Sequence, residues 1–289
     1  MTDPRTRFAS PPFSEQSQEM PGCTQRMKPV PDHGEQTYRG SGRLEGCVAI
    51  VTGGDSGIGR AVALAFAREG ASVVVSYLSE TEDAEASLAD VRGAGAEAVA
   101  VAGDLRDEAQ CQDLIDQAVR RFGKLSILVN NAAYQETSDS VEGFSSESFD
   151  RIFKTNVYAP FYLSKAALRH LQPGDSIINT VSIQGYDPGG YLLPYASSKS
   201  ALIGMTKAMA KLTMEQGVRV NAVAPGPVWT PFIPASMPGE KVKNFGKDTL
   251  FGRPAQPAEL APLYVWLASE DASYVTGEVF GATGGSTPL

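Results

Sequence analysis

The chain has 289 residues, of which 42% are hydrophobic, so it is long enough to enclose a large core in one α/β domain or two small ones. Its formal net charge of -8 at pH 7 disfavours nucleic acids and anionic membrane surfaces as partners, and no apolar run approaches the ~20 residues of a membrane-spanning helix. Three scattered cysteines and two histidines predict neither a disulfide scaffold nor a metal site, which favours a reduced, cytoplasmic compartment.

Residues 1–42 differ in composition from the rest of the chain. Six prolines, many polar residues and no sustained hydrophobic period predict an extended or partly disordered N-terminal arm. Its charged residues are not followed by an apolar segment, which argues against a secretory signal peptide. The alternative is an arm that packs on a neighbouring subunit.

From residue 43 onward, strand and helix signals alternate without a break. Short apolar, β-branched runs predict strands at 47–52, 71–77, 96–102, 125–130, 176–181, 218–224 and 278–282. Amphipathic segments predict helices at 58–70, 80–94, 107–122, 195–215 and 257–268, and two more within 149–171. The alternation predicts one doubly wound Rossmann-type α/β domain over residues 43–289, with a mainly parallel sheet of about seven strands.

A glycine-rich turn follows the first predicted strand. Residues 52–59 read TGGDSGIG, and a helix with an apolar face begins within this turn. Glycines let the backbone approach a pyrophosphate, and a helix N-terminus supplies free N–H groups. Strand, turn and helix together predict a dinucleotide site, although the spacing is G-x-x-x-G-x-G and not the commoner G-x-G-x-x-G. The residues expected to line the phosphates and the adjoining ribose are Gly53, Asp55, Ser56, Gly57, Ile58 and Gly59.

Tyr195 and Lys199 lie four residues apart in a predicted helix, so they share one face of it. An ammonium beside a phenol favours the phenolate and lowers the phenol pKa from its usual value near ~10. The pair therefore predicts a proton donor and acceptor for carbonyl–alcohol chemistry. The spacing alone leaves open a tyrosine packed on the core beside a solvated lysine.

Together these two motifs resemble those of the short-chain dehydrogenase/reductase superfamily, over roughly residues 43–285. Ala133 departs from that resemblance, because the family usually has glycine there. Residues 28–46 resemble the leader of an N-terminally extended bacterial subgroup of NAD(P)-dependent aldehyde/alcohol oxidoreductases, which implies packing of residues 28–42 on the oligomer. Further features occur in the family's order: Asp104-Leu105, NNAA at 130–133, Asn156, Ser182 and PGPVWT at 225–230.

The resemblance implies a catalytic role for four residues. Tyr195 would donate the proton, and Lys199 would lower the Tyr195 pKa and bind the nicotinamide ribose. Ser182 would hydrogen-bond the substrate oxygen, and Asn156 would hold a water that connects Lys199 to solvent. The remaining cofactor contacts would come from Asp104, Leu105, Asn131, Ala132, Ala133, Pro225, Gly226, Val228 and Thr230.

The end of the second predicted strand bears on the choice between NAD and NADP. An acid there would bind the ribose 2′-OH and repel a 2′-phosphate, but Tyr77 and Leu78 stand there and no acid occurs before Glu80. No Arg or Lys replaces the acid, and Asp55 would leave a phosphate poorly compensated. The pattern slightly favours NADP(H) and leaves NAD(H) or dual use open, with Tyr77 and Leu78 as walls of the adenosine pocket.

The function implied is hydride transfer between NAD(P)(H) and a small carbonyl or alcohol substrate, as in an aldehyde or ketone reductase or an alcohol dehydrogenase. A sugar or polyol dehydrogenase similar to glucose and ribitol dehydrogenases is the alternative enzyme, and a non-catalytic NADP-binding sensor is the third hypothesis. The resemblance also implies a homotetramer, and the long connection at 226–255 predicts a lid. The residues expected in the substrate pocket are Ser182, Gln184, Tyr186, Tyr191 and Trp229.

Overall fold

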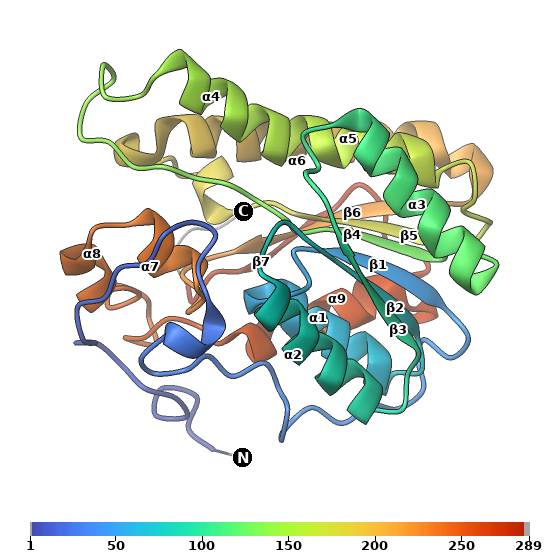
Figure 1. Ribbon diagram of the computed structural model, residues 1–289, viewed down its shortest axis with the longest axis horizontal. Helices are drawn as coiled ribbons and strands as arrows, with labels where there is room; N and C mark the ends of the chain where they lie inside the picture. Colours follow the sequence, from blue (N-terminus) through green and yellow to red (C-terminus); the bar gives the residue numbers. More distant parts are fainter. Residues whose placement is uncertain (1, 286–289) are drawn as a thin grey trace.

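A single parallel sheet runs through the centre of the computed structural model, which describes residues 2–285 (Figure 1). Within those residues seven strands pair in the order β3-β2-β1-β4-β5-β6-β7. The prediction of one doubly wound domain with a parallel sheet is confirmed, apart from residues 286–289, which lie outside the described part. The strands are β1 (Val48–Thr52), β2 (Ser72–Tyr77), β3 (Ala98–Ala102), β4 (Ile127–Asn130), β5 (Ser176–Thr180), β6 (Arg219–Pro225) and β7 (Val279–Ala282).

Helices cover both faces of this sheet (Figure 1). One face carries α1 (Gly57–Arg68), α2 (Thr81–Gly93) and α9 (Pro257–Ala268). The other carries α3 (Glu108–Phe122), α4 (Ser146–Phe153), α5 (Ala159–Ala167) and α6 (Leu193–Thr213). A π-helical turn, Lys154–Tyr158, joins α4 to α5. The long connection after β6 contains α7 (Phe232–Ser236) and α8 (Gly239–Lys243).

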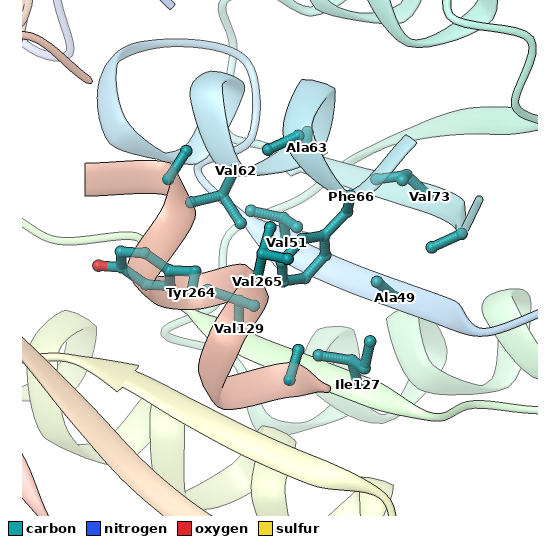
Figure 2. Packing of buried hydrophobic residues seen from close by; sticks show 14 of the residues in the cluster. Ala49, Val51, Val62, Ala63, Phe66, Val73, Ile127, Val129, Tyr264 and Val265 are labelled. Atoms are coloured by element: carbon teal, nitrogen blue, oxygen red, sulfur yellow. The ribbon is translucent and has the colours of Figure 1, made fainter. Parts of the chain in front are cut away.

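The alternation of side chains along β1 builds the two layers of the core. Ala49 and Val51 point toward α1 and α9, where Phe66 and Val265 pack on them (Figure 2). Ile50 points the other way, into the layer of α3 and α5. Every residue of β1 is buried, as expected for a central parallel strand covered on both faces. This packing fixes the carboxyl end of β1, where the glycine-rich turn begins.

The N-terminal arm packs on the rest of its own chain, between the α7–α8 segment and the α1–α2 pair (Figure 1). Phe13 and Met27 are buried in a small cluster with Trp229, and the rings of Phe13 and Trp229 are 4.2 Å apart. The Trp229 indole N–H donates to the Pro29 carbonyl at 2.8 Å. These contacts bring the arm over the connection that follows β6.

Farther along the arm, a buried carboxylate holds the chain just before β1. Glu69, at the end of α1, accepts hydrogen bonds from the Tyr38 hydroxyl and the Ser41 N–H, and it forms an ion pair with Arg43. Burial would raise the Glu69 pKa, but these partners outweigh it and hold the pKa at about 2. None of the helices in residues 2–285 is both long and apolar enough to cross a membrane.

Candidate active site

A cleft opens at the carboxyl ends of the strands, and the glycine-rich turn forms one of its walls. β1 ends at Thr52, Gly53 adopts a φ of +61°, and α1 begins at Gly57. A Cβ on Gly59 would lie 1.9 Å from the Gly53 carbonyl oxygen, so only glycine permits this close approach. The tight turn points the N-terminus of α1 at the cleft, which fits the pyrophosphate of a dinucleotide.

Thr52 ties the end of β1 to the end of β4. Its hydroxyl accepts the N–H of Asn131 at 2.9 Å and that of Ala132 at 3.0 Å. In return, the Asn131 amide donates to the Thr52 carbonyl at 3.0 Å. The NNAA segment is therefore held against the glycine-rich turn. Ala133 lines the cleft, so the site accommodates its methyl group where the family usually has glycine.

Tyr195 and Ser182 meet in the middle of the cleft. Tyr195 comes from the first turns of α6, and Ser182 comes just after β5. The Ser182 hydroxyl is close enough to the Tyr195 hydroxyl to influence its pKa, and the Tyr195 side chain is almost fully buried. Burial raises the Tyr195 pKa to about 12, because it penalises the phenolate, and the nearby Ser182 hydroxyl opposes this shift. The site holds Tyr195 as a neutral phenol.

Lys199 lies one helical turn farther on, with its Nζ 5.5 Å from the centre of the Tyr195 ring. Nζ donates to the Thr180 carbonyl at 2.8 Å. Burial lowers the Lys199 pKa to about 7, because the ammonium has lost its water shell. The predicted lowering of the Tyr195 pKa by Lys199 is therefore absent from this site: the lysine itself is driven toward its neutral form, and burial of the phenol dominates.

Asn156 supports the site from behind and does not line the cleft. It lies in the π-helical turn, a distortion that often marks functional positions. Its side-chain oxygen accepts the Tyr134 N–H at 2.8 Å, and its amide donates to the Tyr134 carbonyl at 2.9 Å and to Ser198 at 3.0 Å. The Asn156 amide is thus committed to holding the start of the 134–137 loop against α6.

The segment after β2 places the acidic side chains of Glu80 and Asp83 near the glycine-rich turn. Tyr77 and Leu78 line the cleft as predicted for the adenosine wall. Asp55 is buried, and burial raises its pKa to about 7, with Glu80 and Asp83 adding to the shift. Hydrogen bonds from its own backbone and from Ser56 act in the opposite direction. Asp55 therefore changes charge near neutral pH.

Two arginines that were not predicted also line the cleft. Arg106 forms an ion pair with Asp104, the residue expected to accept from adenine, and lowers the Asp104 pKa. Arg151 stacks 3.9 Å from the centre of the Tyr134 ring. Arg106 stands two residues after Asp104 and four residues after the end of β3, and this position was the only sequence signal for its presence there.

The substrate end of the cleft differs from the prediction at two positions. Gln184 and Tyr191 line it, but Tyr186 and Trp229 do not. Trp229 is fully buried because Phe13 and Phe245 cover it, and Tyr186 packs on the apolar cluster beside Val181. Lining residues that the sequence analysis missed include Gln135, Thr180, Phe232, Met237 and two residues of the arm, Met20 and Pro21.

Most of the predicted cofactor and catalytic residues come together around this one cleft. Gly59 and Asn156 lie just behind the wall and shape it. Those that line it are Gly53, Asp55, Ser56, Gly57, Ile58, Tyr77, Leu78, Asp104, Leu105, Asn131, Ala132, Ala133, Ser182, Tyr195, Lys199, Pro225, Gly226, Val228 and Thr230.

Comparison with known proteins gives one consistent picture. Residues 53–287 match the sequence profile of the family described as "Enoyl-(Acyl carrier protein) reductase". The chain is 49% identical over 265 residues to the uncharacterized oxidoreductase YhdF of Bacillus subtilis, which covers 92% of each chain. It is 42% identical to the glucose and ribitol dehydrogenase of Daucus carota, over 96% of each chain. It is 41% identical to NADPH-dependent aldehyde reductase 1, chloroplastic, of Arabidopsis thaliana, over 92% of this chain and 95% of that one.

A solved structure agrees with these relatives. The short chain dehydrogenase from Burkholderia cenocepacia, determined in complex with NADP, superposes with a TM-score of 0.79 at 31% identity. The match covers 84% of this chain and 98% of that one. About a sixth of this chain therefore falls outside the match.

Proposed function

Because this chain belongs to the short-chain dehydrogenase/reductase superfamily and is an oxidoreductase, we propose that it transfers a hydride between NADP(H) and a small aldehyde or ketone. The observation that carries the proposal is the pair of Ser182 and Tyr195, which lie together in the cleft with Lys199 one helical turn away. A phenol and a hydroxyl held together can both bind the one oxygen atom that changes charge when a carbonyl becomes an alcohol.

In the reducing direction the chain's residues supply the proton and the oxygen-binding groups. Ser182 donates a hydrogen bond to the carbonyl oxygen and stabilises the charge that develops there. Tyr195 gives its phenolic proton to the same oxygen, so that the product is a neutral alcohol. Lys199, which titrates near neutral pH, is placed to return a proton to the phenolate. A bound reduced nicotinamide supplies the hydride.

The cleft residues fit that cofactor. The turn of Gly53 and Gly57 with the start of α1 would hold the pyrophosphate, and Thr230 closes against it. A Cβ on Gly57 would lie 3.0 Å from the Thr230 methyl group, which shows how closely the segment after β6 approaches this turn. The NNAA segment and Lys199 would contact the ribose groups.

NADP(H) is the favoured form of the cofactor in this proposal. No acid stands directly at the end of β2, where one would bind a free ribose 2′-OH. The NADP complex of the B. cenocepacia structure and the name of the A. thaliana relative, an NADPH-dependent aldehyde reductase, support the same preference. Asp55 is compatible with a 2′-phosphate when it is protonated, which its raised pKa permits below about 7.

A sugar or polyol dehydrogenase remains the second candidate, for a specific reason. The substrate end of the cleft combines Gln135 and Gln184 with Ser182, so it offers amide groups that can bind several hydroxyls. The D. carota relative carries the corresponding name. Phe232 and Met237, which also line the cleft, favour the smaller, less polar carbonyl substrates of the first candidate.

The test is a steady-state assay of NADPH and NADH oxidation with aldehydes, ketones and keto-sugars. Tyr195→Phe should lower turnover by about 10²- to 10⁴-fold while nucleotide affinity is retained. Tyr274→Phe is the matched control, because the Tyr274 side chain is fully exposed. Retained turnover in Tyr195→Phe would refute the assignment, and turnover with polyhydroxylated substrates alone would favour the second candidate.

We also propose that the enzyme assembles as a homotetramer, as the family resemblance implies. Tyr158 and Phe161, near the start of α5, expose 45% and 46% of their surface although both are large and apolar in character. A neighbouring copy packed along α4 to α6 would cover them. Light scattering of the purified protein tests this: a tetramer mass supports it, and a monomer at micromolar concentration contradicts it.

A further inference from the structure

The N-terminal arm reaches the cofactor cleft itself. Met20 and Pro21 are among the residues that line the cleft, although they lie more than 30 positions before the glycine-rich turn. Figure 1 shows this blue part of the chain between α7 and α2. Residues 18–24, which we call the clasp loop, make this crossing.

On the side of α7, the clasp loop is bound through its backbone. The Gln18 N–H donates to the Pro234 carbonyl at 2.9 Å. Gly22, with a φ of +88°, packs so closely that a Cβ on it would lie 2.7 Å from the Pro231 carbonyl oxygen. Pro231 and Phe232 line the cleft next to Thr230, so this contact places the loop beside the segment that closes against the glycine-rich turn.

The clasp loop is closed on itself by one side chain. The Gln18 side-chain oxygen accepts the Cys23 N–H at 2.7 Å, and the Gln18 amide donates to the Cys23 carbonyl at 3.2 Å. This pair of bonds joins the two ends of the loop and projects the residues between them as a compact unit. Met20 and Pro21 form its tip and face the cleft.

On the opposite side, the clasp loop is bound to α2. The Thr24 N–H donates to the Asp83 carboxylate at 2.8 Å, and both residues are buried. The Cys23 thiol lies 3.9 Å from the other Asp83 oxygen. Asp83 is in the first turn of α2, close enough to Asp55 to raise the pKa of that residue. This attachment therefore lies at the 2′-phosphate end of the proposed cofactor site.

Both flanks of the clasp loop are anchored more strongly than the loop itself. Before it, Phe13 packs on Trp229 and its N–H donates to the Lys243 carbonyl at 2.9 Å. After it, Met27 is buried in the same cluster. The crossing between them depends on a few hydrogen bonds and one close glycine contact. The loop can therefore detach without unfolding the arm.

From this arrangement we infer that the clasp loop closes over bound dinucleotide and retains it between turnovers, with Met20 and Pro21 as cofactor-contacting residues. A loop attached to both sides of the cleft must release at least one side before a dinucleotide leaves, so its opening sets the dissociation rate. The attachment to Asp83, which consists of the Thr24 backbone hydrogen bond and the Cys23 thiol contact, is the side that we test for opening. The inference depends on the proposed function only in that the cleft binds NAD(P)(H).

The decisive experiment locks the attachment to α2. In Asp83→Cys the new thiol stands beside the native Cys23, and oxidised dithiothreitol converts the two thiols into one disulfide. Stopped-flow fluorescence then measures NADPH dissociation before and after oxidation. We expect release at least about tenfold slower when oxidised, and faster than wild type when reduced because Thr24 has lost its acceptor. Added reductant should restore the fast rate. Cys23→Ala/Asp83→Cys is the control that cannot lock.

A second variant keeps the inference testable if the disulfide does not form. Gly22→Ala should push the clasp loop off Pro231 and speed NADPH release by about fivefold or more. Gly46→Ala is the matched control: Gly46 has a φ of +70°, but nothing lies within 4 Å of a Cβ there. Both variants carry comparable backbone strain, so a change in the release rate confined to Gly22→Ala reports on the loop contact.

The outcomes separate this inference from the proposed function. If NADPH does not bind at all, both fail. If NADPH binds and supports turnover but its dissociation rate is the same in the oxidised and reduced forms, the clasp is refuted and the reductase stands. Equal NADPH dissociation rates from Gly22→Ala and Gly46→Ala would likewise overturn the clasp inference.

Discussion

The Lys199 ammonium donates to the Thr180 carbonyl at 2.8 Å, a contact that joins α6 to the end of β5. It places a buried amine between the Tyr195 ring and the sheet, and no carboxylate within residues 2–285 pairs with it. The Thr180 hydroxyl is in turn hydrogen-bonded with Tyr264 at 2.8 Å and donates to Asn131 at 3.3 Å. Thr180 therefore links the lysine to the NNAA segment that lines the cofactor cleft.

Replacing this lysine should remove a pH dependence of stability. The folded-state Lys199 pKa is about 7, below the ordinary value of 10.5. Between these values the unfolded chain holds a proton that the folded chain has released, so this group makes the free energy of unfolding rise with pH. We expect Lys199→Met to be more stable than wild type at neutral pH. Its free energy of unfolding should no longer increase with pH through this group. Urea unfolding at about pH 7 and about pH 9 measures it, and parallel pH profiles for the two proteins would contradict it.

The glycine-rich turn makes a second prediction. Gly59→Ala should reduce nucleotide affinity by more than about tenfold, because the new Cβ would lie 1.9 Å from the Gly53 carbonyl and displace the pyrophosphate turn. Gly93→Ala, at the end of α2, is the control, since nothing lies within 4 Å of a Cβ there. Titration of intrinsic fluorescence with NADPH measures both affinities. Equal affinity in the two variants would show that this turn does not bind the cofactor.

The raised pKa of Asp55 leads us to expect that the cofactor preference depends on pH. Its pKa of about 7 means that it is neutral below that pH and charged above it. The preference for NADPH over NADH should therefore fall as pH rises through 7, because a charged Asp55 repels the 2′-phosphate. Asp55→Asn should lose this part of the dependence. The phosphate titrates with a pKa near ~6 in both proteins, so the comparison isolates the carboxylate. Identical dissociation-constant ratios against pH would rule the effect out.

The buried carboxylate that holds the arm should matter for stability. Glu69→Gln is expected to lower the free energy of unfolding by about 1.5–3 kcal/mol, because it loses hydrogen bonds to a charged acceptor. The Glu69 pKa is held at about 2, below its ordinary 4.5, so its contribution is present above 4.5 and is lost as pH falls toward 2.

The measurement for Glu69 is the denaturant midpoint at neutral pH and at about pH 4. Glu97→Gln is the control, since Glu97 pairs with Arg121 on the surface and such pairs contribute only about 0–1 kcal/mol. If both substitutions shift the midpoint equally, the Glu69 network does not stabilise the arm.

The sequence by itself determined the order of strands and helices and the place of the cofactor turn. Each of these depends on local periodicity or on spacing within one element: a buried apolar strand, glycines that a tight turn requires, and a tyrosine and lysine four residues apart. The parallel sheet then follows from the connectivity rules, which bring the carboxyl ends of all the strands to one edge of the sheet.

The tertiary structure alone decided which long-range neighbours complete the cleft. Trp229 is an aromatic residue of the kind expected in a substrate pocket, but Phe13, more than 200 positions earlier, covers it. Met20 lines the cleft because the arm returns across it, and no local pattern encodes that path. The pKa of Lys199 falls because burial removes its water, whereas spacing predicted only that it stands beside Tyr195. Burial and contact between distant segments are properties of the folded chain, since they arise only when packing brings those segments together.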